Sequence, residues 1–441
     1  MTGSRRCCAS SAGCARRAIA RPEAAPRRQP SRSAPLTPRD DLAEAPAPAR
    51  RERLSMPRTR RHGTRVSAWV GWARGVLSLL AVAGLTVTIL PHAEATAWWV
   101  RTLDFPRLQF LIAQAVLLGL LLALPRRLHW SSMVAGVVAA TGVVWQAAVL
   151  FPYTPLSPVR MMAAGADCPS GNRLRVVAAN VQMTDESAEP LFALLRRADP
   201  DVILLQETDA WWAQHLQALS GQWPHSAKQV TQNYFGMEIL SKYPLVDPQV
   251  HFLTDSRNPS IFTGLALPSG TVVRFYGVHP RPPLAGQAST ERDGQLLAAA
   301  LAARQDGGPA VMAGDFNAVP WEGVLQHVER VGGLLSPRIG RDWVPTFRTG
   351  SLLMTWPLDH ILAGPRFTLR TLEALPDFGS DHYPILAELC YAPEAAAHQP
   401  VPAARPGDIA AAQKTVTAAQ NMAGPSPQPA AGKQAPGPAS D

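Results

Sequence analysis

The sequence predicts an α/β fold, a two-sheet α/β sandwich, preceded by three transmembrane α-helices. Three long apolar runs within residues 66–151 predict the helices. Short apolar strands alternate with helical stretches over residues 174–393, and this pattern favours a single domain in which helices pack on sheets. Polar residues able to bind a cation or a phosphate follow many of these strands, so we expect a functional site at the strand ends.

The positive charge of the chain lies mainly at its N-terminus. The net charge is +9, but residues 1–65 hold 16 Arg against 5 acidic residues, whereas residues 174–393 hold 16 Lys and Arg against 22 acidic residues. An acidic working domain argues against a basic nucleic-acid-binding face. We expect residues 1–65 to be a disordered basic arm, with Met56 as a second candidate start, and the Ala- and Pro-rich residues 394–441 to be a disordered tail.

Three uncharged runs have the length of membrane spans. They cover residues 75–90, 108–124 and 130–151, and roughly 17–25 apolar residues cross the hydrocarbon core of a bilayer. A buried helix of a soluble protein is the alternative interpretation. Three such runs in one block, with Trp residues near their ends, favour contact with a lipid bilayer through three spans.

The basic flanks of the spans predict their orientation. Arg residues precede the first span and residues 125–129 are also basic, whereas the other two flanks are nearly balanced. The positive-inside rule then places the N-terminus in the cytoplasm and everything beyond residue 152 outside it. Residues 152–173 contain four Pro residues and are predicted to be a tether between the last span and the domain.

The predicted domain combines amphipathic stretches, which are typical of helices, with short apolar runs, which are typical of buried strands. Helices are expected over residues 189–197 and 291–304. Strands are expected over residues 174–179, 202–205, 235–241, 250–253, 271–277, 310–314, 360–363, 368–374 and 383–391.

One predicted strand shows how an apolar run leads into a polar loop. The strand stops at Gly314, and Asp315 and Asn317 follow two residues apart, so both side chains point to one side if the chain stays extended. An Asx turn, in which they bond only the local backbone, is the alternative. Carboxylates, carboxamides and imidazoles suit magnesium-assisted hydrolysis of phosphoesters. Groups of these kinds lie near other strand ends: Asn180, Gln206, Glu207, His279, Asp359, His360, Asp381 and His382.

These motifs, in this order, resemble the endonuclease/exonuclease/phosphatase superfamily, whose members have the DNase I-like fold. The three predicted spans also resemble a bacterial membrane-anchored branch, which implies the inner membrane and a periplasmic catalytic domain. Ala179 and Glu238 depart from the family's usual pattern close to the site. The motifs that carry the resemblance are Asn180, residues 205–208, Gly236 with residues 240–244, His279-Pro280, and residues 314–318, 358–362 and 380–384.

The resemblance implies a Mg²⁺ cofactor, with Mn²⁺ or Ca²⁺ as alternatives. Glu207 matches the principal metal ligand, Asn180 matches a residue that helps to hold the metal or phosphate, and Asp381 matches a second metal-site carboxylate. Asp315 matches the carboxylate that orients the attacking water. Asn317 matches the carboxamide that donates to the pentacovalent phosphate.

The resemblance also implies roles for three imidazole and carboxylate groups. His382 matches the essential imidazole, as a base or as a phosphate-bound cation, and Asp359 matches the carboxylate that fixes its tautomer. His279 matches the general acid toward the leaving oxygen, with a satisfied strand-end histidine as the alternative. Asn233 is expected to contact phosphate together with Asn317 and His382.

The sequence therefore predicts a metal-dependent phosphoric ester hydrolase. Water would attack a phosphodiester, or a phosphomonoester, without a covalent intermediate, because no nucleophilic side chain lies among the motifs. The substrate is a nucleic acid in the nuclease-like interpretation and a phospholipid such as sphingomyelin in the alternative. A non-catalytic binding module on the same fold is the alternative of another class, and no protein partner is predicted. A Cys168–Cys390 disulfide would close the domain if the first and last strands are neighbours.

Overall fold

The computed structural model describes residues 61–93, 95–123, 130–255 and 257–423. Three of the predicted features lie wholly or mostly outside the described residues. They are the basic arm with the candidate start Met56, the basic connection 125–129 and the end of the predicted tail.

The first sheet places the N-terminal strand of the domain at its centre. Strand β1 runs parallel to β2 and antiparallel to β11. The order across the sheet is β10-β11-β1-β2-β4-β3. The strands are β1 (Arg173–Asn180), β2 (Val202–Gln206), β3 (His225–Gln229), β4 (Met237–Ser241), β10 (Phe367–Ala374) and β11 (Ile385–Tyr391).

The second sheet has the order β5-β6-β7-β8-β9. Strands β7 and β8 are parallel, and β9 returns antiparallel beside β8. The two mixed sheets confirm the predicted α/β sandwich. The strands are β5 (Leu245–His251), β6 (Ser260–Ala266), β7 (Val272–Gly277), β8 (Ala310–Asp315) and β9 (Asp359–Ala363).

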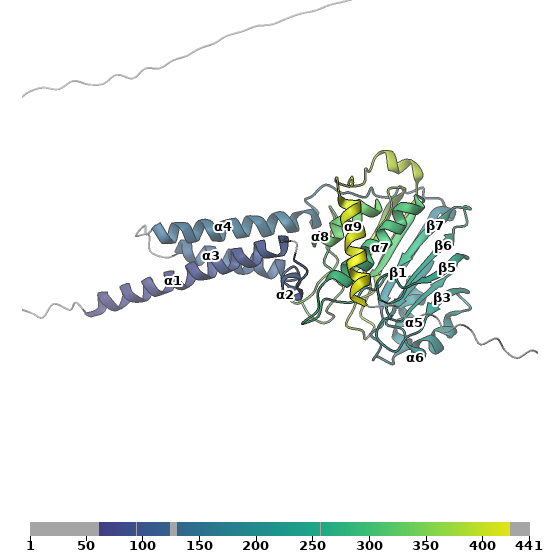
Figure 1. Cartoon of the computed structure of the whole chain (residues 1–441), viewed down its shortest axis with the longest axis horizontal. Coiled ribbons are helices and arrows are strands. Elements are labelled where there is room, and N and C mark those ends of the chain that lie inside the picture. The colour runs from purple at the N-terminus through teal and green to yellow at the C-terminus, as the bar shows by residue number, and fades with distance from the viewer. Residues whose placement is uncertain (1–60, 94, 124–129, 256, 424–441) are drawn as a thin grey trace, which may run out of the picture. The chain divides into compact units, whose positions relative to one another are not determined.

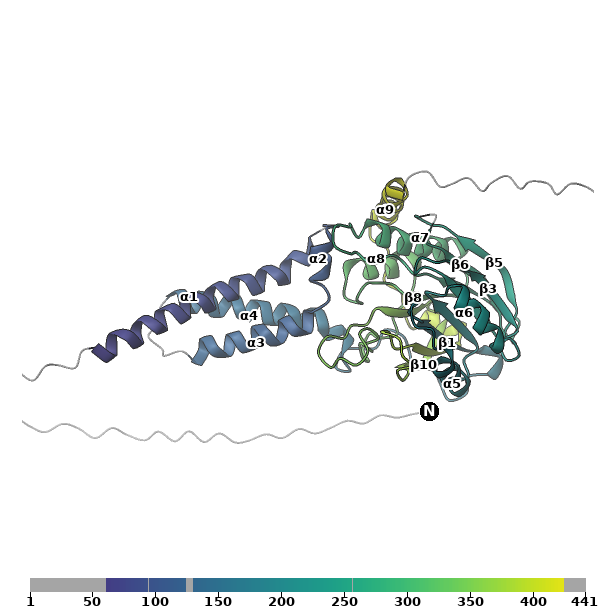
Figure 2. The same cartoon turned by 90° about the horizontal axis from the view of Figure 1, so that it is seen from below.

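Apolar side chains from both sheets fill the space between them. Val176, Leu204, Phe275, Val311 and Ile361 are fully buried in this central core. Helices α5 (Ala188–Ala198) and α6 (Ala210–His215) cover the outer face of the first sheet, and α7 (Thr290–Asp306) and α8 (Gly323–Gly332) cover that of the second (Figures 1 and 2).

Several elements were not predicted, namely β3, β6, α6 and α8. Strand β6 shows why. Its polar Ser260 and Thr263 are completely buried, and Gln295 donates a hydrogen bond of 2.9 Å to Ser260 Oγ. Polar residues that are satisfied inside the protein interrupt the apolar run by which a strand is read from sequence.

The N-terminal helices are α1 (Arg61–Ile89), the short α2 (Trp98–Thr102), α3 (Arg107–Ala123) and α4 (Trp130–Leu150). Two of them, extended as Trp69–His92 and Trp130–Tyr153, are long and apolar enough to cross a membrane. Helix α3 has only 17 residues as described. Its first turn is occupied by the buried Arg107, which pairs with Asp104 at 2.7 Å. The prediction of three spans is therefore corrected to two helices of spanning length.

These helices carry polar groups inside and apolar groups outside. Thr88 Oγ1 accepts hydrogen bonds from Gln114 at 2.8 Å and from Gln146 at 3.1 Å between the helices. Small residues such as Ala139 allow the helices to pack closely. Large apolar side chains such as Leu79 point outward. This arrangement is the reverse of that in a soluble helical bundle.

Residues 152–173 pack along the domain, which corrects the prediction of a tether. Tyr153 donates to the carbonyl of Pro320 at 2.6 Å, and Met161 is completely buried. The backbone N–H of Ala164 bonds the carbonyl of Leu369 at 2.8 Å. The apolar residues between the prolines supply this contact, and composition alone did not reveal it.

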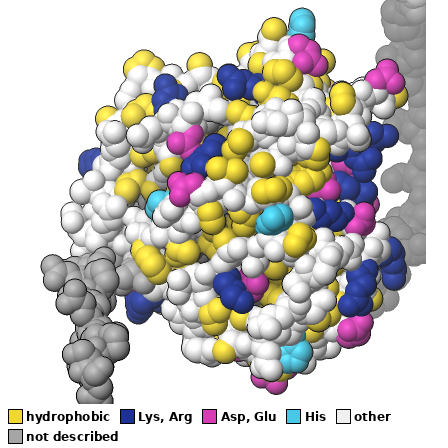
Figure 3. Space-filling view, turned by 90° about the vertical axis from the view of Figure 1, so that its right-hand side faces the viewer, with side chains coloured by type: hydrophobic (Ala, Val, Ile, Leu, Met, Phe, Trp, Pro, Cys, Tyr) yellow, Lys and Arg dark blue, Asp and Glu magenta, His cyan; other side chains and the backbone are white. Residues whose placement is uncertain are grey.

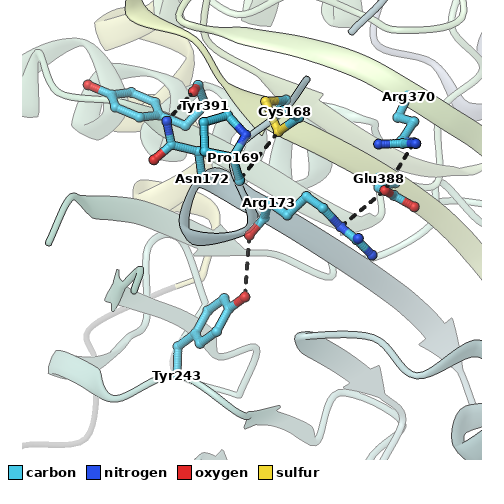
Figure 4. Close-up of a disulfide and its surroundings, with 9 residues drawn as sticks. Cys168, Pro169, Asn172, Arg173, Tyr243, Arg370, Glu388 and Tyr391 are labelled. Atoms are coloured by element: carbon cyan, nitrogen blue, oxygen red, sulfur yellow. Dashed lines mark hydrogen bonds and ion pairs between the residues drawn. A yellow bond between two sulfur atoms is a disulfide. The ribbon is translucent and has the colours of Figure 1, made fainter. Parts of the chain in front are cut away.

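The predicted Cys168–Cys390 disulfide is confirmed. Because β1 and β11 are neighbours, with Arg173 opposite Cys390, the chain before β1 reaches the end of β11. Figure 4 shows the disulfide beside Asn172, whose side chain bonds the carbonyl of Tyr391 at 3.0 Å. The bridge therefore ties the segment before β1 to the C-terminal end of β11.

The predicted disordered tail is also corrected. Residues Asp408–Ala423 form helix α9, which packs on α7. Ala412 and Ala419 are completely buried, and a Cβ added at Gly294 of α7 would press against Ala419. The helical spacing of Ile409, Ala412, Val416 and Ala419 was present in the sequence, but the surrounding Ala and Pro residues suggested low complexity.

Candidate active site

The strand directions bring the predicted site residues to one edge of the sandwich. Parallel β1 and β2 end at this edge, and antiparallel β11 begins there. In the second sheet, parallel β7 and β8 end at the corresponding edge, and β9 begins there. Asp315 and Asp359 are direct partners in the β8–β9 register. The residues that this topology gathers are Asn180, Glu207, His279, Asp315, Asn317, Asp359, Asp381 and His382.

Asp315 occupies a turn that depends on Gly314. Gly314 has φ +142°, and a Cβ there would overlap the carbonyl oxygen of Val278, so only glycine fits. Asp315 Oδ1 accepts a hydrogen bond of 2.9 Å from the backbone N–H of Asn317. The Asx turn considered above is therefore present, but it uses only one carboxylate oxygen.

The second oxygen of Asp315 faces two imidazoles. Oδ2 lies 3.6 Å from Nε2 of His382 and 3.8 Å from Nε2 of His279. Burial raises the pKa of Asp315, because desolvation penalises its charged form. The site therefore holds a carboxylate that binds a proton more readily than an exposed aspartate does.

His382 is fixed by the completely buried Asp359. Its Nδ1 lies 2.8 Å from Asp359 Oδ2, which leaves Nε2 directed at Asp315. Burial lowers the pKa of His382, but the carboxylates of Asp359 and Asp315 outweigh it and raise the pKa to about 10. The predicted pairing of His382 with Asp359 thus exists in the structure, and it favours the imidazolium form.

His279 has the opposite electrostatic character. Burial, together with the nearby charge of His382, lowers its pKa to about 4. Its Nδ1 has no hydrogen-bond partner within the described part of the chain. His279 is therefore a neutral imidazole near neutral pH, and before substrate binds it is not charged as a general acid would be.

Glu207 lies just beyond the end of β2, with φ +64°, a conformation that costs free energy and is found at functional sites. Asn180 Nδ2 donates to its Oε1 at 2.8 Å, and the backbone N–H of Met183 donates to Oε2 at 3.2 Å. Burial raises its pKa. Among the described residues no Lys or Arg forms an ion pair with Glu207. The Glu207 carboxylate thus accepts two hydrogen bonds but forms no ion pair. Its oxygens keep lone pairs that can bind a hard divalent cation.

Asp315, Asp359 and His382 form a second group whose geometry alone would allow a metal ion to bind. Ligand atoms of Asp315, Asp359 and His382 lie within 4.8 Å of one another. We favour the Glu207 position, because the Nδ1 of His382 already bonds Asp359 and a hard cation prefers oxygen ligands. Both groups border the same cavity.

A cavity of about 630 Å³ opens onto these side chains. Asn233 and Asp381 also line it, whereas Asp359 lies behind His382 and does not. Several lining residues were not predicted, because they lie in loops or, like Thr102, in the short α2, and carry no recognisable motif. They include Thr102, Phe105, Tyr234, Phe235, Arg257, Arg281, Leu284 and Phe347.

One positioning residue also escaped prediction. Arg292 of α7 is completely buried and donates to the backbone carbonyl of Asn317 at 2.9 Å. It also pairs with the buried Glu322. These contacts hold the loop after β8, while the Asn317 side chain donates to the carbonyl of Pro280 at 3.0 Å. A single Arg within a helical pattern gave no signal of this role.

Comparison with solved structures gives distant matches. A protein described as endonuclease/exonuclease/phosphatase from Beutenbergia cavernae is 19% identical, with a TM-score of 0.42, over 50% of this chain and 72% of that one. The human Nocturnin catalytic domain is 19% identical, with a TM-score of 0.42, over 50% and 95%. Sphingomyelinase C from Streptomyces griseocarneus is 18% identical, with a TM-score of 0.37, over 49% and 99%. No curated protein matches the chain.

The comparison with family models concerns the domain that holds the cavity. Residues 177–382 match the model described as the Endonuclease/Exonuclease/phosphatase family. The matched segment begins within β1 and ends at His382, so it contains every residue predicted for the site. The segment that holds the cavity thus matches the endonuclease/exonuclease/phosphatase family.

Proposed function

We propose that this chain is a membrane-anchored, Mg²⁺-dependent phosphodiesterase whose catalytic domain lies outside the cytoplasm. The observation that carries the proposal is that Glu207, which forms no ion pair among the described residues, lines one cavity together with Asp315 and His382, whose imidazole is held from behind by the buried Asp359. Glu207 can bind a metal ion, and Asp315 and His382 can accept and donate protons.

Asp315 and His382 together position the attacking water. Oδ2 of Asp315 takes a proton from this water as the water oxygen forms the new bond to phosphorus. The P–O bond to the leaving alcohol breaks on the opposite side, and His279, protonated once the phosphate is bound, gives its proton to the leaving oxygen. No covalent intermediate forms, because none of the residues gathered at the strand ends is a serine or cysteine nucleophile.

Hydrogen-bond donors of this chain stabilise the negative charge on the phosphoryl group. The imidazolium of His382 and the second amide N–H of Asn317 donate to phosphoryl oxygens. His279 is neutral before substrate binds, and the negative charge of a bound phosphate raises its pKa and so promotes protonation. Glu207 and Asn180, with Asp381 nearby, would hold a Mg²⁺ ion, whose positive charge would stabilise the developing oxyanion.

The membrane anchor is supported by the outward apolar surface of the helices. Leu80, Val82, Val116, Val137 and Val144 are all exposed, and a soluble protein would not leave so much apolar surface uncovered. The Arg residues before α1 favour a cytoplasmic N-terminus. Helix α3 is shorter, but it lies between α1 and α4 in the chain and packs against both. We propose that it returns the chain across the membrane, because two crossings alone would leave the domain on the same side as the N-terminus.

The test uses the full chain in detergent with bis(p-nitrophenyl) phosphate as substrate. We expect hydrolysis with Mg²⁺, loss of hydrolysis in EDTA, and loss of at least about 1,000-fold in Asp315→Asn. Glu189→Gln, which alters an exposed carboxylate on α5, is the matched control and keeps wild-type activity. A folded protein without EDTA-sensitive hydrolysis, or an Asp315→Asn variant with full activity, would contradict the proposal.

A further inference from the structure

The segment between α1 and α3 forms part of the active-site wall. Thr102 and Phe105 line the cavity together with Glu207 and His382. This segment is fixed to the domain, because Trp321 donates from its indole nitrogen to the carbonyl of Asp104 at 2.7 Å. The connection between two of the helices proposed to cross the membrane therefore forms part of the place where substrate binds.

A row of aromatic rings connects this segment to the catalytic imidazole. Phe105 and Trp356 meet edge to face, with ring centroids 5.9 Å apart, and Trp356 stacks on Phe347 at 6.2 Å. The Phe347 ring lies 4.7 Å from that of His382. An apolar wall thus extends without interruption from the helical part of the chain to the reacting group.

The loop that joins two wall residues is strongly apolar at its tip. Phe347 and Leu358 both line the cavity, and between them Leu352 is 98% exposed and Leu353 is 73% exposed. The backbone carbonyl of Leu353 accepts a hydrogen bond from Gln109, in the first turn of α3. The exposed leucines are therefore held beside the apolar helices.

Other features of the domain disfavour an extended nucleic-acid strand. Residues 174–393 hold more acidic than basic side chains. The face turned away from the helices, shown in Figure 3, also intersperses Lys and Arg with Asp and Glu. Arg257 and Arg281 line the cavity, but each pairs with a carboxylate, Asp255 and Glu291 respectively. A polyanion gains most from unpaired cations arranged along a groove.

We propose that the substrate is a lipid phosphoester. Its phosphate lies against His382 and Asn317, and its hydrocarbon chain lies along Phe347 and Phe105 toward Leu352 and Leu353. Burying a hydrocarbon chain against these side chains removes apolar surface from water on both partners. This inference rests on the proposed phosphodiesterase function and on the proposed membrane anchor, because the exposed leucines would then meet the bilayer from which the substrate comes.

The experiment compares phosphodiesters that differ only in their acyl chains. The full chain, reconstituted in vesicles with Mg²⁺, is given dioleoyl phosphatidylglycerol or its deacylated form, glycerophosphoglycerol. Dioleoyl phosphatidylethanolamine, dioleoyl phosphatidic acid and a single-stranded oligonucleotide are tested in parallel. We expect at least one acylated ester to be hydrolysed with a kcat/KM about 100-fold or more above that of its deacylated counterpart.

Two variants test the wall. In Leu352→Ser/Leu353→Ser the ratio of lipid to bis(p-nitrophenyl) phosphate hydrolysis falls by about tenfold or more, because two apolar contacts with the acyl chain are lost. Phe105→Ala lowers the same ratio. Met422→Ser, which alters a side chain that is 53% exposed on α9, leaves the ratio unchanged and controls for surface polarity.

The outcomes separate this inference from the proposed function. Hydrolysis of bis(p-nitrophenyl) phosphate without any preference for acylated esters, or with a preference for the oligonucleotide, would overturn the lipid assignment and keep the phosphodiesterase. An unchanged ratio in the leucine and phenylalanine variants would also overturn it. Absence of hydrolysis of every ester would contradict the proposed function, and the lipid assignment with it.

Discussion

At the shared edge of the sandwich, the first sheet contributes Glu207 and Asn180, and the second contributes Asp315 and Asp359. The carboxylates of the second sheet have a cationic partner within the protein, because the pKa of His382 is raised to about 10. The carboxylate of the first sheet, Glu207, forms no ion pair with Lys, Arg or His in the described part of the chain, and the more distant charge of His382 offsets its burial only in part. This comparison supports the proposal that the second sheet's half of the site is complete after folding, whereas the half with Glu207 takes up a cation from outside.

The largest loss of activity is expected from a change in the second sheet's half of the site, at His382. His382→Gln removes the imidazole that neutralises Asp315 and Asp359, and we expect kcat to fall by about 1,000- to 10,000-fold. Hydrolysis of bis(p-nitrophenyl) phosphate by the full chain in detergent measures it. His225→Gln, in β3 away from the cavity, serves as the control. A loss of less than about tenfold would show that His382 acts only in folding or packing.

A change at Glu207, in the first sheet's half of the site, should alter the dependence of activity on Mg²⁺ concentration. Glu207→Gln keeps the size of the side chain but removes its charge and one of its two acceptor oxygens, so we expect the Mg²⁺ concentration for half-maximal activity to rise about 100-fold. Thermal unfolding gives a second readout. Mg²⁺ should raise the Tm of the wild type but not that of the variant. An equal shift of Tm in both proteins would place the metal elsewhere, and the group of Asp315, Asp359 and His382 would then be the first alternative.

His279 should have a smaller effect, because it is neutral and touches the array only through Asp315. We expect His279→Asn to lower kcat/KM by about 10- to 100-fold. The pH dependence identifies its role. If a bound phosphate raises its pKa and it then protonates the leaving oxygen, the alkaline limb of the kcat profile disappears in the variant. A profile that keeps its shape while its height falls would assign His279 to positioning alone.

The sequence predicted the site more fully than the surroundings of the site. Glu207, Asp315 and His382 could be recognised because each follows or precedes an apolar run, and strand directions in a mixed sheet then bring them together. Phe105 and Phe347 could not be recognised. Each belongs to a segment whose position depends on tertiary contacts, such as the hydrogen bond between Trp321 and Asp104.

The errors in the fold have a similar cause. The segment 152–173 and helix α9 were assigned to a tether and a tail from their Pro and Ala content. Met161 and Ala419 are nevertheless completely buried, because the domain offers surfaces that fit them. Composition describes the free energy of an isolated segment, whereas these segments are ordered by contacts distant in sequence.

The smallest effect is expected on the free energy of unfolding. It tests whether burial of the charged Asp315 side chain destabilises the folded state. Burial raises the pKa of Asp315 above its value of 3.8 in the unfolded chain. Below about pH 4 both states are protonated and the group costs nothing. As pH rises the unfolded chain ionises first, and stability is lost until the folded pKa is passed. Asp315→Asn removes this cost, so with EDTA present the variant should be more stable than the wild type at pH 7.5, by about 1–2 kcal/mol.

Thermal unfolding of the full chain in detergent, followed by tryptophan fluorescence at pH 4 and pH 7.5, measures this difference. The gain is limited because Asp315 also helps to stabilise the imidazolium of His382, and that contribution is lost together with the cost. The two proteins should therefore unfold at nearly the same temperature at pH 4 and separate as pH rises. A variant that is less stable at pH 7.5 would mean that the attraction between Asp315 and His382 outweighs desolvation. The pair of Asp315 and His382 would then stabilise the folded chain. It would differ from Glu207, which has no ion-pair partner among the described residues, in stability as well as in charge.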